Sequence, residues 1–592
     1  MASRWQFHWA ARITGAVTAI GVVAGAAHAG PDTPDPALVR SSIYVPVRDG
    51  TKLAVNIYRP AEGGVARDGK FPIVFAFTPY RARYFDKDGH LVDMVDQPVF
   101  GLRDLVHAGY VVATADVRGK GASFGARRGF LDRTEAHDGY DLIQWLAAKP
   151  WSSGKVGIVG CSYLGGSAML VAGTLPPALR AVFAGATDID KYNFVRQGGI
   201  TAQFNTRPDE PPEVDLASVP VDGDTDGALL KAAVAQHAGN TPMAKLWESM
   251  PYRDSVSPLT RNRFWAEVGP NTHLAALRSK QLAWYLWDNW EDEPTEQMIM
   301  AAGNLDTRLI IGPGSHCVPP PASAFSITGE ERRFFDHYLK GADNGIEREP
   351  RYAWYHEGAN GTGTMVRSAT LPGVGVARTS FYLSTRPNDA PAAFDTGSLS
   401  LARPAASKAP FKVDYDLGTG EYFAFWPAVL DGKGLTYTSA PLAADAGMTG
   451  YPVARITATL DRADANLFAY LEDVAPDGKA HMVSFSRLAA SHRKLATAPY
   501  QRLGLPYHSG LKADVAPMIP GKPADFVMAM SPRAYTFAAG HRVRVTLTGA
   551  DPRQRNLAQI RQDPPPVFTV MQGGAAASRV DIPFTTKPTF RR

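Results

Sequence analysis

The chain has 592 residues, a formal net charge of +5 from 62 Lys and Arg against 57 Asp and Glu, and only two cysteines. The weak positive excess is spread out with no Lys/Arg block, which argues against nucleic acid as a partner. A chain of this length exceeds what one hydrophobic core usually supports, so two or three domains are expected.

The N-terminus has the three parts of an export signal. Arg4 and Arg12 precede an apolar run at 13–26, and Ala27-His28-Ala29 supplies the small residues that signal peptidase reads. A membrane anchor is the alternative, but the run of about 14 residues is shorter than the roughly 20 that span a bilayer. We therefore predict a signal peptide over 1–29, cleaved after Ala29, and a periplasmic or secreted protein with no membrane association afterwards.

The chain next predicts a hairpin and then a parallel sheet. Residues 42–58 form two β-branched runs around Arg48-Asp49-Gly50. Short apolar runs typical of strands buried on both faces then alternate with helical patterns. The expected strands are 71–77, 111–117, 155–160 and 180–185, with a helix over 135–150.

This rhythm pauses at 188–278, where we expect a mostly helical insertion, and then resumes. The resumed part predicts strands at 280–287 and 307–312, with helices at 294–303 and 330–341. From 349 onward, Pro and Gly separate alternating apolar runs, as in a β-sandwich or jelly roll. The sequence leaves open whether that last part binds carbohydrate or closes structurally over the first.

Ser162 lies where a strand meets a helix. "VGIVG" precedes Cys161-Ser162 and "YLGGSAMLVAG" follows, the context in which a sharp turn exposes a nucleophilic serine. Gly160 fits the first glycine of the GxSxG pattern, whereas Leu164 replaces the second, which falls one position later at Gly165. The alternative is a serine that caps the helix and takes no part in chemistry.

A serine nucleophile needs a base and an orienting acid, in the chain order Ser, acid, His for this kind of sheet. His316 follows the apolar strand "LIIG" in a Gly/Pro-rich loop, and Asp288 follows the strand "LAWYLW". We predict Ser162, Asp288 and His316 as the triad, with Asp292 as the main competitor for the acid. An exposed loop histidine and a strand-end aspartate that caps the next helix are the alternative interpretations.

Acyl transfer also needs donors for the developing oxyanion. The backbone N–H of Tyr163, directly after the nucleophile, supplies one. No glycine run follows the strand "FPIVFAF"; "TPYR" stands there instead, so the hydroxyl of Tyr80 is the candidate for the second donor. A packed loop aromatic is the alternative for Tyr80.

Several motifs together resemble one family of serine hydrolases. They are "VRDGTKLAVNIYRP", "TPYRAR", "DVRGKGASFG", "DGYDLIQWLAAKPWSSGKVGIVGCSYLGG", "GPGSHC" and "RFFDHYLKGADNG". They are similar to the group of bacterial cocaine esterase, α-amino acid ester hydrolases, glutaryl-cephalosporin acylases and X-Pro dipeptidyl-peptidases. The resemblance runs from about 42 to 345 and continues weakly through "AYTFAAGHRVRVTLTG".

The resemblance implies a three-part architecture, with an α/β-hydrolase domain over 30–187 and 279–348, a helical cap over 188–278 and a jelly-roll domain over 349–592. It also implies the triad and oxyanion residues named above.

Amino acid ester hydrolases hold the substrate ammonium with acids, some just after the triad acid. This makes Glu291 and Asp292 candidates for substrate binding, with Asp188 and Asp190 as substitutes. A solvated acidic helix start is the alternative.

The two cysteines adjoin two predicted triad residues. Cys161 precedes Ser162 and Cys317 follows His316. If Ser162 and His316 share a hydrogen bond, their neighbours can approach to the roughly 4.4–6.8 Å between Cα atoms that a disulfide needs, and export supplies an oxidising compartment. We predict a Cys161–Cys317 disulfide; two small buried thiols are the alternative.

The sequence therefore predicts a secreted serine hydrolase that cleaves ester or amide bonds of small acyl substrates, resembling amino acid ester hydrolases and cocaine esterase. The alternatives are an X-Pro-type dipeptidyl-peptidase and, from another class, an inactive glycan-binding protein on a hydrolase scaffold. We expect a small-molecule substrate and no cofactor, and the absence of CxxC and HExxH spacings argues against a metal. A homo-oligomer is compatible with the sequence.

Overall fold

The structure is a computed structural model, and it describes residues 35–201, 210–321, 325–359, 361–386, 396–417, 431–551 and 560–591. The predicted signal peptide, residues 1–29, lies outside these ranges. Within them, no helix combines the length and apolar character needed to cross a membrane. Residues Pro36–Arg592 form one compact unit.

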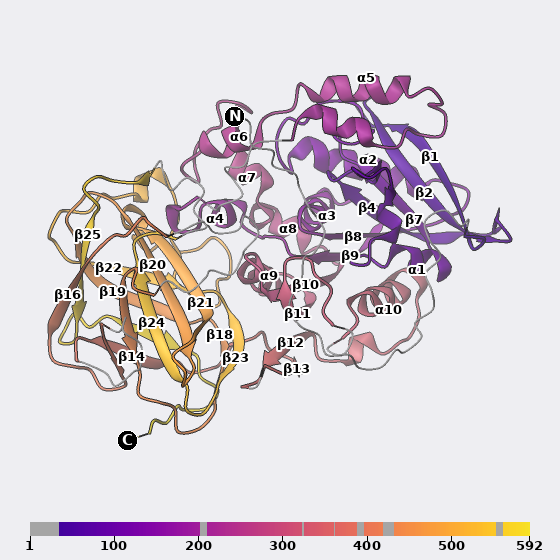
Figure 1. The fold of residues 1–592 in the computed structure, drawn as a ribbon. Helices are drawn as coiled ribbons and strands as arrows, with labels where there is room; N and C mark the ends of the chain where they lie inside the picture. Colours follow the sequence, from indigo (N-terminus) through magenta and orange to yellow (C-terminus); the bar gives the residue numbers. More distant parts are fainter. Residues whose placement is uncertain are drawn as a thin grey trace. The chain divides into compact units, whose positions relative to one another are not determined.

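The first sheet is mainly parallel and runs in the order β1-β2-β7-β4-β8-β9-β10-β11-β12-β23-β18 (Figure 1). Neighbours from β7 to β12 are parallel, as the buried apolar runs predict. The strands are β1 (Leu38–Pro46), β2 (Lys52–Glu62), β4 (Phe71–Thr78), β7 (Val111–Asp116), β8 (Ser152–Cys161), β9 (Leu179–Gly185), β10 (Ala283–Glu291), β11 (Thr307–Ser315), β12 (Tyr352–Glu357), β18 (Ala446–Gly450) and β23 (Arg533–Phe537).

Smaller strands border this sheet. β3 (Val65–Ala66) pairs with β2, β13 (Gly363–Ser368) pairs with β12, and β5 (Arg83–Phe85) forms a separate hairpin with β6 (Leu91–Asp93). The predicted N-terminal hairpin is the antiparallel pair β1 and β2, joined by a turn in which Gly50 has a φ of 82°.

Helices cover both faces of the sheet, and each face has its own apolar core (Figure 1). The first core holds side chains of α2 (Arg133–Ala147), α3 (Tyr163–Gly173), α8 (Leu274–Leu277) and α9 (Thr295–Ala302). The second holds side chains of α1 (Leu102–His107) and α10 (Ile327–Lys340). The short 3-10 helices η1 (Met94–Asp96) and η6 (Ile346–Arg348) complete this part.

The regular elements of the insertion between β9 and β10 are, within its described residues, short helices joined by loops. A small core of its own includes Trp247 and Trp265, whose rings stack 5.0 Å apart. Its elements are α4 (Lys191–Val195), η2 (Gln197–Gly199), η4 (Pro212–Ala217), α5 (Ala228–His237), α6 (Met243–Glu248), α7 (Phe264–Val268), η5 (Pro270–His273) and α8.

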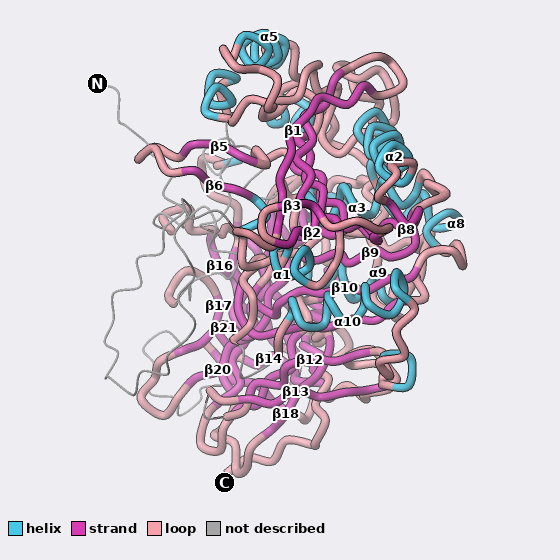
Figure 2. The backbone as a smooth tube through the Cα atoms, turned by 90° about the vertical axis from the view of Figure 1, so that its right-hand side faces the viewer, coloured by secondary structure: helices cyan, strands magenta, loops and turns pink. Residues whose placement is uncertain are grey.

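The second sheet runs in the order β16-β25-β19-β26-β14-β15-β17-β24-β20-β21, with β22 on β19, around a separate apolar core (Figure 2). Its strands are β14 (Thr379–Ser384), β15 (Gly397–Ser400), β16 (Ser407–Lys412), β17 (Leu435–Thr438), β19 (Val453–Leu460), β20 (Asn466–Val474), β21 (Ala480–Ala489), β22 (Ala524–Ala529), β24 (Arg542–Thr548), β25 (Val567–Gln572) and β26 (Arg579–Ile582). The 3-10 helices η7 (Ala490–His492) and η8 (Lys512–Asp514) lie in its connections.

Strand pairing crosses the boundary expected at 348/349. β12 and β13 follow that boundary, yet β12 is hydrogen-bonded to β11 of the first sheet. β12 in turn meets β23, which pairs with β18, and side chains of β18 and β23 enter the core of the second part. Strand pairing therefore continues from the catalytic sheet into the sandwich.

Candidate active site

Ser162 occupies a sharp turn between β8 and α3. Its backbone has a φ of 61° and a ψ of −126°, which is strained for a residue with a side chain and is typical of an exposed nucleophile. A Cβ at position 160 would lie 2.3 Å from the carbonyl carbon of Leu164, and one at 165 would lie 2.4 Å from the oxygen of Gly185. Glycine is therefore required at both positions, which explains the shifted second glycine.

The structure brings Ser162, His316 and Asp292 into one hydrogen-bonded chain. Nε2 of His316 lies 2.8 Å from Oγ of Ser162, and Nδ1 of His316 lies 2.8 and 3.0 Å from the two carboxylate oxygens of Asp292. Because a carboxylate only accepts, Nδ1 carries the proton and Nε2 faces the serine as the acceptor. This is the arrangement of a serine nucleophile, a general base and an orienting acid.

The prediction of Asp288 as the acid is wrong, because Asp292 contacts His316 instead. The strand expected at 280–287 ends at Trp287, whereas β10 continues to Glu291 and makes Asp292 the first residue beyond it. The pairing of β10 with β11 shifts register between Asn289 and Glu291, a bulge that re-aims the strand end. Asp288 stays inside the sheet, buried beside Asp292.

Two features that do not take part in the chemistry hold the loop of His316. The buried side chain of Asn289 donates to the carbonyl oxygens of Ser315 (2.7 Å) and Val318 (2.8 Å), on either side of the histidine. The structure also pairs Cys161 with Cys317, as predicted, with 6.0 Å between their Cα atoms. Sequence reasoning missed Asn289; its position on the strand between the two candidate acids was the available signal.

The negative charge of Asp292 shifts the pKa of His316. Burial by itself lowers the pKa of His316, but the negative charge and hydrogen bond of Asp292, with a smaller contribution from Glu293, raise it above its ordinary value. The neutral base that catalysis needs is therefore lost at a higher pH than for a free histidine, whose pKa is about 6.5.

The two predicted oxyanion donors lie next to each other. Tyr163 is the first residue of α3, where a backbone N–H has no partner inside the helix. The ring of Tyr80 meets that of Tyr163 edge-on, with centroids 6.2 Å apart, and half of Tyr80 is exposed. The loop of Tyr80 is braced by Asp116, which accepts the N–H of Ala82 at 2.7 Å.

The side chain of Tyr163 is anchored beneath the turn. Its hydroxyl donates to the buried carboxyl of Glu135 and accepts from Arg127 at 2.6 Å. Burial raises the pKa of Glu135 to about 7, although Arg127 opposes the shift. Glu135 and Arg127 were not singled out from the sequence, because nothing in the local pattern of α2 separates them from ordinary helix residues.

The acids nominated for a substrate ammonium are already engaged. Asp292 holds His316, and Glu291 lies 3.1 Å from the guanidinium of Arg533 in β23. The two substitutes are also paired, Asp188 with the buried Lys191 and Asp190 with Arg253 at 2.8 Å. Each of the four nominated acids therefore already contacts a basic side chain, and Glu291 shares its arginine with Glu357.

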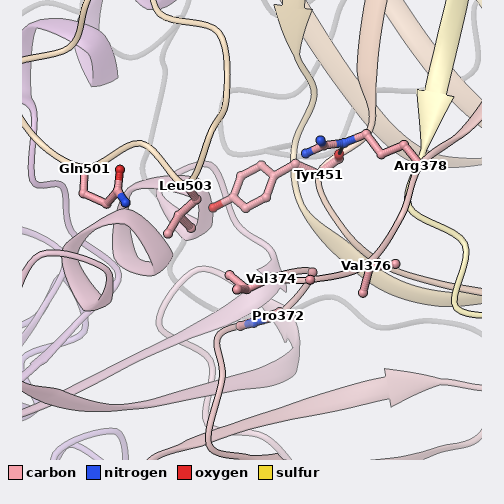
Figure 3. A pocket seen from close by; sticks show the side chains of 9 residues that line it. Pro372, Val374, Val376, Arg378, Tyr451, Gln501 and Leu503 are labelled. Atoms are coloured by element: carbon pink, nitrogen blue, oxygen red, sulfur yellow. Dashed lines mark hydrogen bonds between the residues drawn. The ribbon is translucent and has the colours of Figure 1, made fainter.

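Two other features lie outside the triad. A cavity of about 290 Å³ is lined by Pro372, Val374, Arg378, Tyr451, Gln501 and Leu503 (Figure 3). No residue of the triad lines it, so we assign it no catalytic role. Among the described residues, Asp86, Asp88 and His90 form the one close group of metal-ligating types, on the turn between β5 and β6. Backbone N–H groups of that turn already bind Asp86.

Two family models match most of the chain. The model of X-Pro dipeptidyl-peptidase (S15 family) matches residues 49–318, and that of the X-Pro dipeptidyl-peptidase C-terminal non-catalytic domain matches 344–570. The chain therefore contains an S15-type catalytic domain followed by the C-terminal non-catalytic domain that accompanies it, and it is a serine hydrolase. Its segment from 49 to 318 contains Ser162, Asp292 and His316, so the triad lies within the S15 match.

Individual relatives agree with this assignment. The chain is 28% identical to a Mycobacterium bovis protein whose name proposes a serine esterase, over 92% of this chain and 95% of that protein. It is 26% identical to cocaine esterase of Rhodococcus sp., over 75% of this chain and 81% of that enzyme. A CocE/NonD family hydrolase from Staphylococcus aureus shares the fold, with a TM-score of 0.69 and 18% identity over 93% of this chain and 94% of the other.

The geometry of the triad supports acylation and deacylation of Ser162. Nε2 of His316 takes the proton of Ser162 as its Oγ attacks the substrate carbonyl, while Asp292 stabilises the imidazolium that forms. The same proton then goes to the leaving group, which departs and leaves an acyl-enzyme on Ser162. Water, activated by His316 in turn, releases the acid.

Proposed function

We propose that the protein is an exported serine esterase that cleaves small carboxylic esters without an α-ammonium group, through an acyl-enzyme on Ser162. The observation that carries the proposal is the hydrogen-bonded chain of Ser162, His316 and Asp292. Acyl transfer from an ester needs this chain and an oxyanion hole, and no further group from the protein.

The pairing of the nominated acids supports the narrower substrate class. An amino acid ester or the free N-terminus of an X-Pro peptide brings a positive charge into the site. Glu291, Asp188 and Asp190 each contact a basic side chain, and the pairs of Asp188 and Asp190 are buried, so an ammonium group binding either of these two would have to compete with its partner. Breaking a buried ion pair is costly, so simple esters fit the site better.

Export is proposed from the signal sequence and the disulfide together. Residues 1–29 have the features of a cleaved signal, and a disulfide persists in the oxidising compartments to which such signals lead. N-terminal sequencing of the exported protein should then begin at Gly30.

A substrate panel tests the proposal. p-Nitrophenyl acetate and butyrate should be cleaved with a kcat/KM at least about tenfold above that for p-nitrophenyl esters of α-amino acids, a difference of about 1.4 kcal/mol. X-Pro p-nitroanilides should be cleaved more slowly still. Ser162→Ala should lose on the order of 10⁴-fold or more in turnover, and a fluorophosphonate should label Ser162 in the wild type.

Two results would overturn parts of the proposal. Faster cleavage of X-Pro anilides than of simple esters would assign the dipeptidyl-peptidase activity instead. A stable adduct on a serine other than Ser162, or full activity of Ser162→Ala, would remove the nucleophile.

A further inference from the structure

Asp288 is a buried carboxyl group that the catalytic steps do not use. It lies within β10, opposite Ile311 of β11, and is 1% exposed. Its Oδ1 accepts the N–H of Asn289 at 2.8 Å. Its Oδ2 is buried and, among the described residues, meets no fixed donor. A carboxylate in this position would leave a negatively charged oxygen without a partner, which is costly in a protein interior.

The carboxyl group of Asp292 nonetheless lies within hydrogen-bonding reach of that of Asp288 and acts on it with its negative charge. Two ionised carboxylates offer only acceptors and repel each other, so such a bond exists only if one of them carries a proton. Asp292 is the ionised partner, because both its oxygens face Nδ1 of His316 and its Oδ1 also accepts the N–H of Glu293 at 2.8 Å.

The proton therefore belongs on Asp288. We propose that Asp288 is a positioning residue for the triad: an un-ionised carboxylic acid whose Oδ2–H donates a hydrogen bond to the carboxylate of Asp292. The bond fixes the orientation of the Asp292 carboxylate toward His316. It also weakens the electrostatic attraction between that carboxylate and the imidazolium of His316. Burial and the neighbouring charge of Asp292 both raise the pKa of Asp288 well above its usual range, in agreement with this state.

The charged groups around Asp288 and Asp292 are paired elsewhere and do not stabilise an ionised Asp288. From the same strand end, Glu291 is paired with Arg533 and Glu293 with Arg487, both basic residues of the sandwich. From α9, Glu296 is paired with Arg502. Among the described residues, none of these cations contacts Asp288, and its carboxyl group is influenced by Asp292 and by the N–H of Asn289.

The proposal rests on the triad of the proposed function, so its test uses no ester substrate. The rate at which diisopropyl fluorophosphate inactivates Ser162 is measured against pH, because the midpoint of this profile reports the ionisation of His316. In Asp288→Asn the amide N–H replaces the carboxyl O–H as donor and no charge is lost. We expect its midpoint within about 0.3 pH unit of the wild type.

An ionised Asp288 predicts a different dependence of the inactivation rate on pH. If Asp288 were ionised, Asp288→Asn would remove a nearby negative charge and lower the midpoint by about one pH unit or more. Asp288→Ala removes the donor, so Asp292 attracts the imidazolium more strongly, and we expect the midpoint to rise. An unchanged midpoint in Asp288→Ala would contradict the positioning role.

Infrared difference spectra give a readout that is independent of activity. The wild type minus Asp288→Asn at pH 7.5 should contain the carbonyl stretch of an un-ionised carboxylic acid; carboxylate bands in its place would overturn the proposal. Glu331→Gln is the matched control. Burial also raises the pKa of Glu331 well above its usual range, so this variant should lose a similar band without moving the inactivation midpoint. If Asp288→Asn fails to fold, Asp288→Thr serves for the same subtraction.

Discussion

Tyr80 and Tyr163 are expected to donate to one oxygen atom, but they are held very differently. Tyr163 is buried, and its hydroxyl is tied to Glu135 and Arg127, which fixes its backbone N–H at the start of α3. Tyr80 is half exposed on a loop and meets the site through its ring contact with Tyr163. The backbone N–H of Tyr163 is therefore a fixed donor, whereas the hydroxyl of Tyr80 belongs to an accessible side chain that a substrate can contact.

We predict that Tyr80→Phe lowers kcat by roughly 10²-fold, because it removes the hydroxyl that donates to the developing oxyanion and keeps the ring. Because half of Tyr80 is exposed, the thermal unfolding midpoint should match that of the wild type. Steady-state kinetics with p-nitrophenyl acetate measure the effect, and Tyr84→Phe, on the nearby hairpin, is the control. An unchanged kcat in Tyr80→Phe would give the second donor to another group.

At the scale of elements, the catalytic loops are tied to neighbouring strand ends. β8 leads into the nucleophile, β10 into the acid and β11 into the base, because parallel strands present their carboxyl ends at one edge of the sheet. Asn289 of β10 clamps the loop after β11, and the disulfide links that loop to the end of β8. The hydrogen bonds of Asn289 and the disulfide therefore both restrict the movement of the loop that carries His316.

We predict that Cys161→Ala/Cys317→Ala is both less stable and slower. The bridge spans a sequence separation of 156 residues, for which the chain-entropy model gives an upper value of about 5 kcal/mol. Turnover should fall several-fold, because small displacements of a base reduce its efficiency. Thermal unfolding with and without reductant measures the first effect: reductant should lower the midpoint of the wild type and leave the double variant unchanged. Equal midpoints for all samples would show that the bridge contributes nothing.

At the scale of the whole molecule, the sandwich supports the triad acid. Three arginines of the C-terminal part pair with three glutamates that flank Asp292 along the chain. The pair of Arg487 in β21 and Glu293 joins residues 194 positions apart, and both side chains are 5% exposed. The C-terminal part is thus tied to the chain segment that carries Asp292 through these three ion pairs.

We predict that Arg487→Leu destabilises the protein by about 3–5 kcal/mol, because it leaves Glu293 buried without a partner. The unbalanced charge of Glu293 should also raise the pKa of His316 further, so the acid limb of the pH–rate profile should move to higher pH.

The controls for this prediction use the same measurements. Arg455→Leu breaks a half-exposed pair with Asp581 and should cost no more than about 1 kcal/mol. Arg487→Leu/Glu293→Leu should recover part of the lost stability and reverse the pH shift. A pH limb unchanged in Arg487→Leu would mean that Glu293 does not act on the base.

Local patterns were sufficient for the parts of the site that depend on one segment. The apolar run, the glycines and the helix after Ser162 predict its turn, since Gly160 and Gly165 are required by contacts within a few residues or with the adjacent strand. His316 follows from its place after a buried strand. The disulfide followed from the adjacency of both cysteines to these two residues.

Only the tertiary structure decided which acid serves the base. Asp288 and Asp292 lie four residues apart in one apolar and acidic segment, and the choice depends on where β10 ends and on its bulge against β11. Likewise, the acids suited to an ammonium group were neutralised by arginines and a lysine whose proximity no local pattern encodes. The sequence by itself determined the kinds of residue and the strand ends that carry them, because these depend on short-range periodicity. The arginine partners of the three glutamates around Asp292 depended on long-range packing, because they lie far from these glutamates in the sequence and meet them only when the first sheet and the C-terminal part pack against each other.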